Sequence, residues 1–514
     1  MRLTNPRYPQ LYGQPKIHKP GAPIRPIVAF YNSPLSALHK TLSNILKPLT
    51  SSSIRLKDSN AFIQHLTTTN TPSYSYYFSL DVVSLYTNCD MRAAVDTAIA
   101  RLEENPDLLP SPLTPQTMRD LLLFCLDNAY FEFDGNFYKQ TSGGVMGSPL
   151  TVTLAEIRTS QLEQHALDTF ADPLHSYRHF VDDGIGAARD ADHATAFLHH
   201  INSLSPDLQY TIEHPKDGFL PYLDVLLHPD LSTSIYRKPT HTNLYLKYNS
   251  STPASTRRSV IQSLTRRAYN LCSPQHLQQE LDTVYSIFLA NGFPPHETST
   301  LMDSVRDKLH RKPTIGDFDR EWRDSQRITH RISLPYHPDL ANPLKRILNR
   351  YNIAVSFSSS STSLRSTLTR TKSSIPSPST SNVIYRIPCL DCPASYIGQT
   401  KRTVLTRITD HERHYRLDKP TDSYGNIKSA PALHALKSSH TMGWNNMEIL
   451  TTAPSSHHLD LLEHSAITIL KPELNRTLKG PAINPQWNSL LPRITSSFRP
   501  RPSNISKFGS PTAS

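Results

Sequence analysis

The sequence of 514 residues is poor in cysteine and glycine and has no long apolar run. Its five cysteines are too few and too scattered for a disulfide framework, and three of them are expected to be small buried side chains: Cys89, Cys125 and Cys272. No window approaches the 18 consecutive apolar residues of a membrane helix, and the first residues lack the apolar core of a signal peptide. We therefore expect a reduced, intracellular protein without a membrane span.

What the chain does contain is proline and positive charge. It has 42 prolines against 16 glycines and only 37% hydrophobic residues, a balance that predicts packed domains joined by polar, proline-containing segments. The length predicts two or three domains. The net charge of +11 is compatible with simple solubility, but it also suits a polyanionic partner, because Lys and Arg facing phosphates supply most non-specific nucleic-acid affinity.

A pair of adjacent carboxylates is the most informative local feature. Asp182 and Asp183 follow an aromatic residue and a valine and precede two nearby glycines, as in a tight hairpin. Such a pair alone is more often a solvated turn. A third carboxylate, Asp81, ends a β-type apolar run, and a glycine-rich turn lies between the two motifs. A few strand-borne aspartates can hold paired divalent ions about 3.5–4 Å apart, and these residues therefore indicate phosphoryl transfer.

Six blocks of sequence, in order, resemble the reverse transcriptase of Penelope-like retroelements: LYGQPKIHKPGAPIRPIV, FSLDVVSLYTN, YKQTSGGVMGSPLT, FVDD, LPYLDVLL and YRKPTHTNLYLKYNSSTP. A seventh block, CLDCPASYIGQTKRTVLTRITDHERH, resembles the GIY-YIG endonuclease that such elements carry downstream. Together the blocks reach from about Leu11 to about Arg476. The resemblance implies a multidomain α+β protein, with a right-hand polymerase fold of fingers, palm and thumb followed by a small α/β nuclease domain.

The resemblance also implies a polymerase site with metal ligands and nucleotide contacts: Asp81, Asp182 and Asp183 for two Mg²⁺, and Lys16, Arg25, Tyr86, Gln140 and Gly147 for the incoming nucleotide. Arg25, helped by Lys16 or Lys19, would contact the triphosphate. Tyr86 would pack under the sugar and disfavour ribonucleotides. From the residues alone, a solvated basic loop, a core tyrosine and a plain strand–helix connection remain open alternatives. A further carboxylate, Asp224, is interpreted as structural.

The expected organisation has five parts: partial fingers and palm (1–255), a helical thumb (256–310), a connector with a Ser-rich basic linker (311–382), the nuclease (383–478) and a basic disordered tail (479–514). Ser33, followed by Pro34, predicts the start of the first helix. Four arginines early in the thumb are expected to grip the template–primer duplex: Arg257, Arg258, Arg266 and Arg267. Just before the thumb, basic residues alternate with tyrosines, which suits either a phosphate-and-stacking surface or a hairpin with aromatic pairs.

In the downstream block, the resemblance implies six nuclease residues: Tyr385, Tyr396, Arg407, His411, Glu463 and Asn475. An aromatic on each of two strands, a helix arginine and a distant glutamate would surround one Mg²⁺ and the scissile phosphate. The chemistry suits these types, because Glu is a hard oxygen ligand, Arg stabilises phosphate charge, and a Tyr or His can take a proton from water. The first strand reads Val-Ile-Tyr where the family name gives Gly-Ile-Tyr.

Cys389 and Cys392 form a C-x2-C pair in the same block, which provides one edge of a tetrahedral zinc site. His434 and His440 are the preferred remaining ligands, and they match the CCHH arrangement of the family. Three other histidines are rivals of lower rank: His457, His458 and His464. Without such partners, a C-x2-C pair could equally be a redox or structural pair.

The leading hypothesis is RNA-templated DNA synthesis coupled to DNA nicking, with an RNA template, a DNA primer and target, dNTPs and a nuclear location. One alternative is a catalytically inactive, nucleic-acid-binding remnant of a retroelement. The family carries an additional N-terminal region with an Asp-Lys motif, which this sequence does not show before Leu11, and we expect an N-terminally truncated copy. Another alternative, a telomerase-like or intron-type reverse transcriptase, is disfavoured by the YIGQT block and its C-x2-C pair.

Overall fold

The computed structural model describes residues 5–17, 21–69, 71–72, 75–311, 330–358, 379–422, 425, 427–453, 456–475 and 501–502. The chain divides into two compact units, of which the larger takes in residues 10–31 and 35–371. The smaller unit takes in 372–514 together with 1–9 and 32–34. Residues 317–326, which read as a helix in the sequence, lie outside the described residues, as do most of the Ser-rich basic linker (359–378) and almost all of the tail. Among the helices that are described, none has the length and apolarity needed to cross a membrane.

The larger unit is a mixed α/β structure built around a four-stranded antiparallel sheet. The strand order is β6-β7-β3-β8, from β3 (Tyr76–Val82), β6 (Ser176–Phe180), β7 (Asp183–Ala188) and β8 (Tyr210–Glu213). The outer edge of β6 is covered, because the amide of Leu56 donates to the carbonyl of His179 at 2.7 Å. The sheet is therefore protected from edge pairing on that side.

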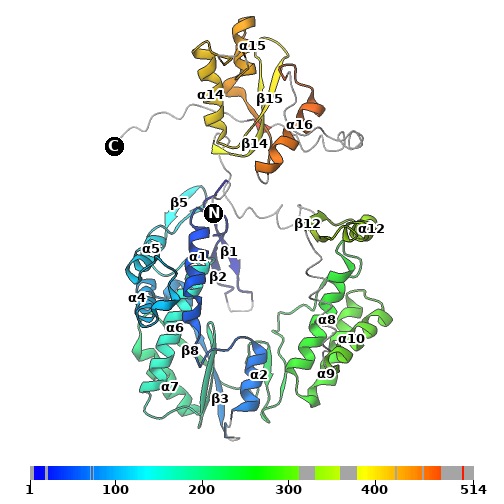
Figure 1. Ribbon diagram of the computed structural model, residues 1–514. Helices are drawn as coiled ribbons and strands as arrows, with labels where there is room; N and C mark the ends of the chain where they lie inside the picture. Colours follow the sequence, from blue (N-terminus) through cyan, green and yellow to red (C-terminus); the bar gives the residue numbers. More distant parts are fainter. Residues whose placement is uncertain are drawn as a thin grey trace. The chain divides into compact units, whose positions relative to one another are not determined.

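Helices pack on both faces of this sheet: α1 (Ser36–Leu46), α2 (Ser59–Thr68), α4 (Met91–Glu104), α5 (Pro115–Asp127), α6 (Pro149–Thr169) and α7 (Ala191–Leu204). Phe78, Leu80 and Val82 belong to the main core, which is also lined by α1 and α4–α7. Tyr77 belongs to the cluster that contains Phe62 of α2, and α2 lies on the other side of β3 from α6 and α7 (Figure 1). Asp81 shares the parity of Tyr77, so its side chain lies on the α2 side.

Local capping explains where most of these helices begin. Side chains of Asp58, Asp90, Thr114, Ser148 and Asp190 each accept an amide hydrogen bond at the first turn of α2, α4, α5, α6 and α7. The apolar spacing of the sequence predicts helices at 91–104 and 114–128, and α4 and α5 confirm both within a residue. The predicted start at Ser33 is wrong, because α1 begins at Ser36 with Leu35 at the cap position and no side-chain cap bond.

The larger unit also contains two antiparallel hairpins. One precedes α1 and pairs β1 (Leu11–Pro15) with β2 (Ile24–Val28); the other lies between α5 and α6 and pairs β4 (Tyr130–Phe133) with β5 (Asn136–Lys139). The turn of the second hairpin is Asp134–Gly135, as the sequence predicts, and both residues have positive φ. Val28 and Phe131 share a small apolar cluster, which joins the two hairpins.

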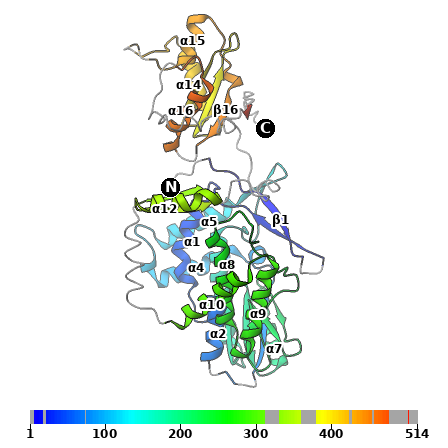
Figure 2. The same ribbon diagram turned by 90° about the vertical axis from the view of Figure 1, so that its right-hand side faces the viewer.

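Beyond the main sheet, β9 (Leu220–Tyr222), β10 (Val225–Leu227) and β11 (Thr233–Ile235) form a small antiparallel sheet. Three helices follow side by side, α8 (Ala254–Leu271), α9 (Pro274–Ala290) and α10 (Pro295–His310) (Figure 2). They pack around Ile261, Val284 and Phe288. A parallel strand pair, β12 (His330–Pro335) and β13 (Ile353–Ser358), is connected by α12 (Pro338–Asn349).

The smaller unit contains a sheet of order β15-β14-β16-β17. Its strands are β14 (Val383–Pro388), β15 (Ser395–Thr400), β16 (Glu448–Thr452) and β17 (Arg501–Pro502). The helices are α14 (Val404–Arg416), α15 (Ala430–Ser438) and α16 (Leu459–Leu470). The predicted hairpin and following helix are confirmed. Tyr385 is fully buried in the core between the sheet and α14 and α15.

Candidate active sites and metal-ligand cluster

Three carboxylates meet at one end of the β3–β7 strand pair. Asp81 is the direct antiparallel partner of Asp183, so their side chains lie on the same face of the sheet. Asp182 occupies the two-residue turn between β6 and β7, and its carbonyl accepts the amide of Val82 at 3.1 Å. The preceding Val181 has φ of 57°, a rare conformation for a β-branched residue. Such strain is typical of turns whose shape is fixed by function.

Crowding and burial raise the pKa of two of these carboxyl groups. Burial raises the pKa of Asp183 to about 6, with further contributions from the negative charges of Asp182 and Asp81. Burial also raises the pKa of Asp182, and Asp81 adds to the effect, while its backbone hydrogen bond and the positive charges of Arg25 and Lys16 oppose it. Three clustered carboxylates, two of them partly buried and Asp81 exposed, match the oxygen ligands that Mg²⁺ prefers. The residues present therefore fit a divalent cation.

Arg25 and Lys16 come from the β1–β2 hairpin. Arg25 lies opposite Gln14 in the ladder, and the amide of Lys16 donates to the carbonyl of Pro23 at 2.9 Å. Their influence on the pKa of Asp182 means that both positive charges face the carboxylates. This end of the hairpin therefore brings cations to the cluster from a segment far away in sequence.

The glycine-rich loop between β5 and α6 contacts β2 of that hairpin. The amide of Val28 donates to the carbonyl of Met146 at 2.8 Å. Gly147 has φ of +125°, and a Cβ there would lie 2.2 Å from the carbonyl oxygen of Val28. Only glycine can fit this backbone against β2.

The same loop reaches Tyr86 on the other side. The amide of Gly144 donates to the carbonyl of Tyr86 at 2.6 Å. The Tyr86 ring is half-buried, and its pKa is raised by burial and by the charges of Asp182 and Glu156, with Arg25 acting in the opposite direction. Gln140 donates to the carbonyl of Ser142 at 3.0 Å, which places it at the start of the loop. Asp182, Arg25, Tyr86 and the loop are thus neighbours.

Sequence reasoning assigned no site role to three further residues near the carboxylates. The Tyr222 hydroxyl donates to the carbonyl of Asp183 at 3.1 Å. Lys238 lowers the pKa of Asp183 by its positive charge, whereas Glu213 raises it. Lys238 had a signal in the sequence as part of the basic and aromatic run, but nothing in that run shows which lysine faces the aspartates.

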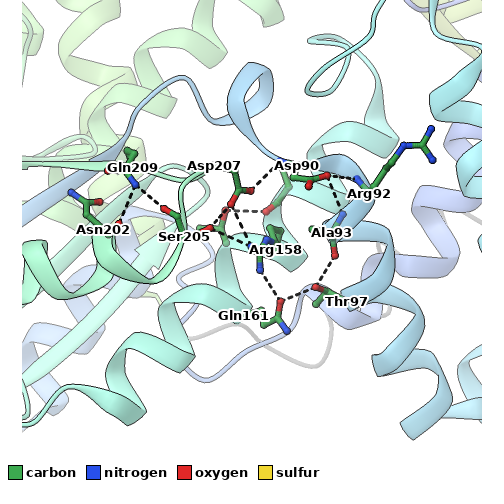
Figure 3. Close-up of polar contacts among 12 residues, drawn as sticks. Asp90, Arg92, Ala93, Thr97, Arg158, Gln161, Asn202, Ser205, Asp207 and Gln209 are labelled. Atoms are coloured by element: carbon green, nitrogen blue, oxygen red, sulfur yellow. Dashed lines mark hydrogen bonds and ion pairs between the residues drawn. The ribbon is translucent and has the colours of Figure 1, made fainter.

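A polar network behind the sheet holds β8 beside β3 (Figure 3). The Asp207 carboxylate accepts from the amide of Asp90 at 3.0 Å and from Arg158 at 3.4 Å. Gln209 donates to the carbonyls of Asn202 and Ser205, and its own carbonyl accepts the amide of Val83 at 2.8 Å. These bonds connect α4, α6 and α7 to the strand that carries Asp81.

The four thumb arginines expected to grip a duplex differ in their surroundings, and their role remains a prediction. Three of the four thumb arginines are engaged within the protein, since Arg257 donates to backbone carbonyls, Arg258 to Glu297 and Arg267 pairs with Asp224 at 3.3 Å. Arg266 is exposed. The run of basic residues and tyrosines before the thumb does not form the alternative β-hairpin, because residues 236–250 contain no strand. Tyr245 and Tyr248 contact the rings of Phe288 and Phe293, and Tyr248 remains 38% exposed.

In the smaller unit, Tyr385 is the centre of a buried polar group. Its hydroxyl lies 2.9 Å from Nε2 of His411, and Nε of Arg407 donates to it at 3.1 Å. Tyr396 lies beside them, with ring centroids 6.3 Å from Tyr385 and 5.6 Å from His411. Burial and the charge of Arg407 lower the pKa of His411 to about 3, so the imidazole is neutral at ordinary pH.

Glu463, on α16, faces the same group. Burial raises its pKa to about 7, while a hydrogen bond from Gln399 and the charge of Arg407 oppose the rise. Gly398 is paired with Tyr385, and a Cβ there would lie 2.7 Å from the tyrosine hydroxyl. Asn475 clamps β15, since its amide group exchanges two hydrogen bonds with the backbone of Ile397 at 2.7 and 2.9 Å. A partly buried carboxylate beside a neutral His and an Arg can hold a hard cation next to a phosphate.

Four metal-ligand side chains converge at the tip of the β14–β15 hairpin: Cys389, Cys392, His434 and His440. The Cys389 sulfur lies 3.6 Å from Nδ1 of His440, and the Cys392 sulfur lies 3.5 Å from Nε2 of His434. The two histidine nitrogens are 3.2 Å apart. A tetrahedral zinc ion would separate sulfur from nitrogen by about 3.6 Å and the nitrogens by about 3.3 Å. The cluster therefore fits zinc, and of the rival histidines His458 and His464 do not join it, whereas the side chain of His457 lies outside the described residues.

Comparison with known proteins gives limited matches. A family model described as an animal helix-turn-helix domain matches residues 244–302. No curated protein matches. Among solved structures, telomerase from Candida albicans, in complex with a fragment of telomeric RNA, matches with 13% identity and a TM-score of 0.39, covering 62% of this chain and 57% of that one.

Two further structures match at a similar level. Apo telomerase from Candida tropicalis has 12% identity and a TM-score of 0.34, covering 46% of this chain and 56% of that one. The Sicinivirus RNA-dependent RNA polymerase has 15% identity and a TM-score of 0.34, covering 59% of this chain and 68% of that one. The chain thus spans just over half of the two telomerase chains. These TM-scores are low, and the function is inferred below from the arrangement of the side chains.

Proposed function

We propose that the larger unit is an RNA-directed DNA polymerase. The observation that carries this proposal is the meeting of Asp81, Asp182 and Asp183 beside Arg25 and Lys16, with the pKa of Asp182 and of Asp183 raised. Mg²⁺ held by the three carboxylates would supply charge stabilisation for the attacking and leaving oxygens. Arg25 and Lys16 would bind the triphosphate, and Tyr86 and the 140–148 loop would border the sugar and base.

The smaller unit is proposed as the GIY-YIG endonuclease of the same polypeptide. Glu463 would hold one Mg²⁺, and Arg407 would bind the scissile phosphate. Tyr385, Tyr396 and His411 would arrange the attacking water, while Asn475 fixes the strand of Tyr396. The Cys389–Cys392–His434–His440 cluster is proposed as a structural zinc site, because all four positions of a tetrahedron are filled by protein ligands.

The two activities together suit a Penelope-like retroelement, in which nicked target DNA provides the primer for copying an RNA template. Its partners would be template RNA, primer and target DNA, and dNTPs, and its site of action the nucleus. The order of the sequence blocks along the chain supports this finer assignment, and the net charge of +11 favours a polyanionic partner.

The deciding experiment separates the two sites. Asp182→Ala should abolish primer extension on an RNA template with dNTPs and Mg²⁺ and leave DNA nicking intact, whereas Glu463→Ala should do the reverse. Asp224→Ala is the matched control, because this carboxylate pairs with Arg267 on the surface. Loss of both activities in either single variant would contradict the two-site assignment. A folded wild-type chain with neither activity would favour the inactive remnant.

A further inference from the structure

The strand residue Gln399 connects the proposed nuclease carboxylate to its surroundings. It lies on β15 directly after Gly398, on the face of the sheet that carries Ile397 and packs on α16. Its side-chain amide nitrogen donates to Oε2 of Glu463 at 3.1 Å and to Oδ1 of Asp460 at 2.5 Å. Asp460 and Glu463 are three positions apart on α16 and therefore share a helix face. A single side chain thus links both carboxylates.

The two carboxylates decide which way the amide group points. An amide group keeps its shape when it is turned by 180°, so its oxygen and nitrogen are distinguished by their partners. Asp460 is exposed, and an ionised carboxylate can only accept a hydrogen bond. The amide nitrogen therefore faces Asp460 and Glu463, since the reverse would place oxygen against oxygen. This orientation leaves the Gln399 oxygen buried and without a hydrogen-bond partner among the described residues.

The arrangement favours the form of Glu463 that binds a cation. The backbone of Gln399 also forms a hydrogen bond with the Glu463 carboxyl group, and both bonds lower the pKa of that group against the effect of burial. A carboxylate has about four lone-pair positions, so two such bonds leave room for a cation. The buried, unpaired oxygen of Gln399 is unfavourable, whereas its two N–H donors are the part of the amide that acts on α16.

We propose that Gln399 is the positioning residue of Glu463: its two N–H donors, one of them held by Asp460, fix the Glu463 carboxylate where it can bind a cation beside Arg407. This inference rests on the proposed nuclease function. Its consequence is that the donors of Gln399 matter and its oxygen does not. A side chain of similar shape without donors should therefore release Glu463.

The first test measures the link itself and needs neither metal nor DNA. In the full chain at pH 8 without divalent cations, Gln399→Met, which is close in shape and has no donors, should lower the Tm of the smaller unit by about 4–8 °C. The same change in a Glu463→Ala background should lower that Tm by much less, because the bond to Glu463 is already gone. Equal losses in the two backgrounds would overturn the proposal.

An isosteric change tests the direction of the bonds. Gln399→Glu keeps the shape of the side chain and replaces its donors by acceptors. At pH 8 it should therefore lower the Tm of the smaller unit further than Gln399→Met does. A Tm at or above that of Gln399→Met would overturn the assignment of the donors.

A third test measures what the link does for the site. Gln399→Met should raise the Mg²⁺ concentration for half-maximal nicking by about 10–100-fold, as loss of an outer partner of a metal ligand commonly does, with little change in KM for DNA. It should also reduce the rise in Tm of the smaller unit that Mg²⁺ produces. Arg386→Met is the matched control, because it removes from β14 the ion-pair partner of a different carboxylate, Glu448. Equal effects of the two changes would overturn the positioning role.

Asp460 distinguishes an anchor from a metal ligand. Asp460→Ala should weaken the Mg²⁺ response less than Gln399→Met does, because Gln399 keeps its bond to Glu463. If Asp460→Ala abolishes the Mg²⁺ response while Gln399→Met retains it, Asp460 is itself a ligand and the proposal fails. A wild type that neither nicks nor responds to Mg²⁺ would refute the proposed nuclease function, whereas the Tm comparison would still decide whether Gln399 holds Glu463.

Discussion

Asp183 is placed where its charge is unfavourable. Its pKa is raised from 3.8 to about 6, mainly by burial and then by the neighbouring aspartates. A carboxyl group with a raised pKa stabilises the folded state below its unfolded pKa, and this contribution is lost as pH rises through the folded value. Folding is therefore weakened by Asp183 above about pH 6 unless a cation is present.

Asp183→Asn should consequently stabilise the protein while abolishing primer extension. Without divalent cations at pH 8, we expect the free energy of unfolding to rise by about 1–2 kcal/mol, after allowing for solvent screening. At about pH 4 the gain should disappear, because the wild-type group is then largely neutral. Thermal or urea unfolding at the two pH values measures this, with the surface residue Asp224→Asn as the control. An equal gain at both pH values would contradict it.

Mg²⁺ should have the complementary effect. A ligand that binds only the folded state raises the free energy of unfolding, by about 2.7 kcal/mol at a hundredfold excess over Kd. We expect millimolar Mg²⁺ to raise the Tm of the wild-type larger unit and to raise it less in Asp183→Asn. Identical shifts in the two proteins would argue against a cation at these carboxylates.

Glu463 should give nicking a steep dependence on pH. Burial raises its pKa to about 7, so a proton competes with Mg²⁺ at and below that pH. At limiting Mg²⁺, we expect the nicking rate to fall up to tenfold for each pH unit below about 7. Saturating Mg²⁺ should shift this acidic limb of the pH–rate profile to lower pH. Steady-state rates at two Mg²⁺ concentrations test this expectation. A limb that does not move with Mg²⁺ would contradict metal binding by Glu463.

At the residue scale, the sequence predicts which residue types form a site better than it predicts which distant residues contact them. Asp81 and Asp183 could be placed in one site because the order of their motifs is distinctive. Lys238 could not, since it acts on Asp183, more than fifty positions earlier, and its own surroundings look like an ordinary basic loop.

At the element scale, the loop from Gln140 to Ser148 connects the parts of the polymerase site. It bonds to Val28 on one side and to Tyr86 on the other. The sequence predicts the hairpin before it and the helix after it, because both have strong local signals. It does not predict the contact with β2, which depends on a chain segment more than a hundred residues earlier.

Gly147→Ala tests that contact. The new Cβ would lie 2.2 Å from the Val28 carbonyl oxygen, and φ of +125° is unfavourable for alanine. We expect a higher KM for dNTP and a loss of stability of about 1 kcal/mol or more. Gly135→Ala is the matched control, because Gly135 has φ of +77° with no atoms within 4 Å of its Cβ position. If both variants extend primers equally well, the clash with β2 has no role in the site.

The segment after β11 shows why the role of the thumb surface is hard to predict from sequence. Arg237 forms a two-pronged ion pair with Glu280 of α9, and the neighbouring tyrosines pack on α9 and the Gly292–Phe293 turn. Alternating basic and aromatic residues fit a nucleic-acid surface and an internal packing surface equally well. Only the position of the glutamate and the phenylalanines in space distinguishes them.

At the scale of the whole molecule, the two compact units should respond separately to loss of zinc. A zinc-selective chelator, added with Mg²⁺ in excess, should lower the Tm of the smaller unit and reduce nicking, because ligand binding and folding are coupled at a closed four-ligand site. Primer extension should persist. His440→Ala should reproduce the effect, whereas His458→Ala, outside the cluster, should not. Calorimetry with and without a chelator measures this, and loss of extension on chelation would contradict separate units.

The smaller unit is also discontinuous in sequence. Asn5 exchanges three hydrogen bonds with Ser381, the residue two positions before β14, through its side-chain amide. A nuclease fragment that begins at residue 372 therefore lacks residues 1–9, which belong to the smaller unit. A polymerase fragment that begins at residue 10 omits the same residues. Anyone dividing this protein for expression should keep the first nine residues with the C-terminal piece, for example by fusing them through a short linker.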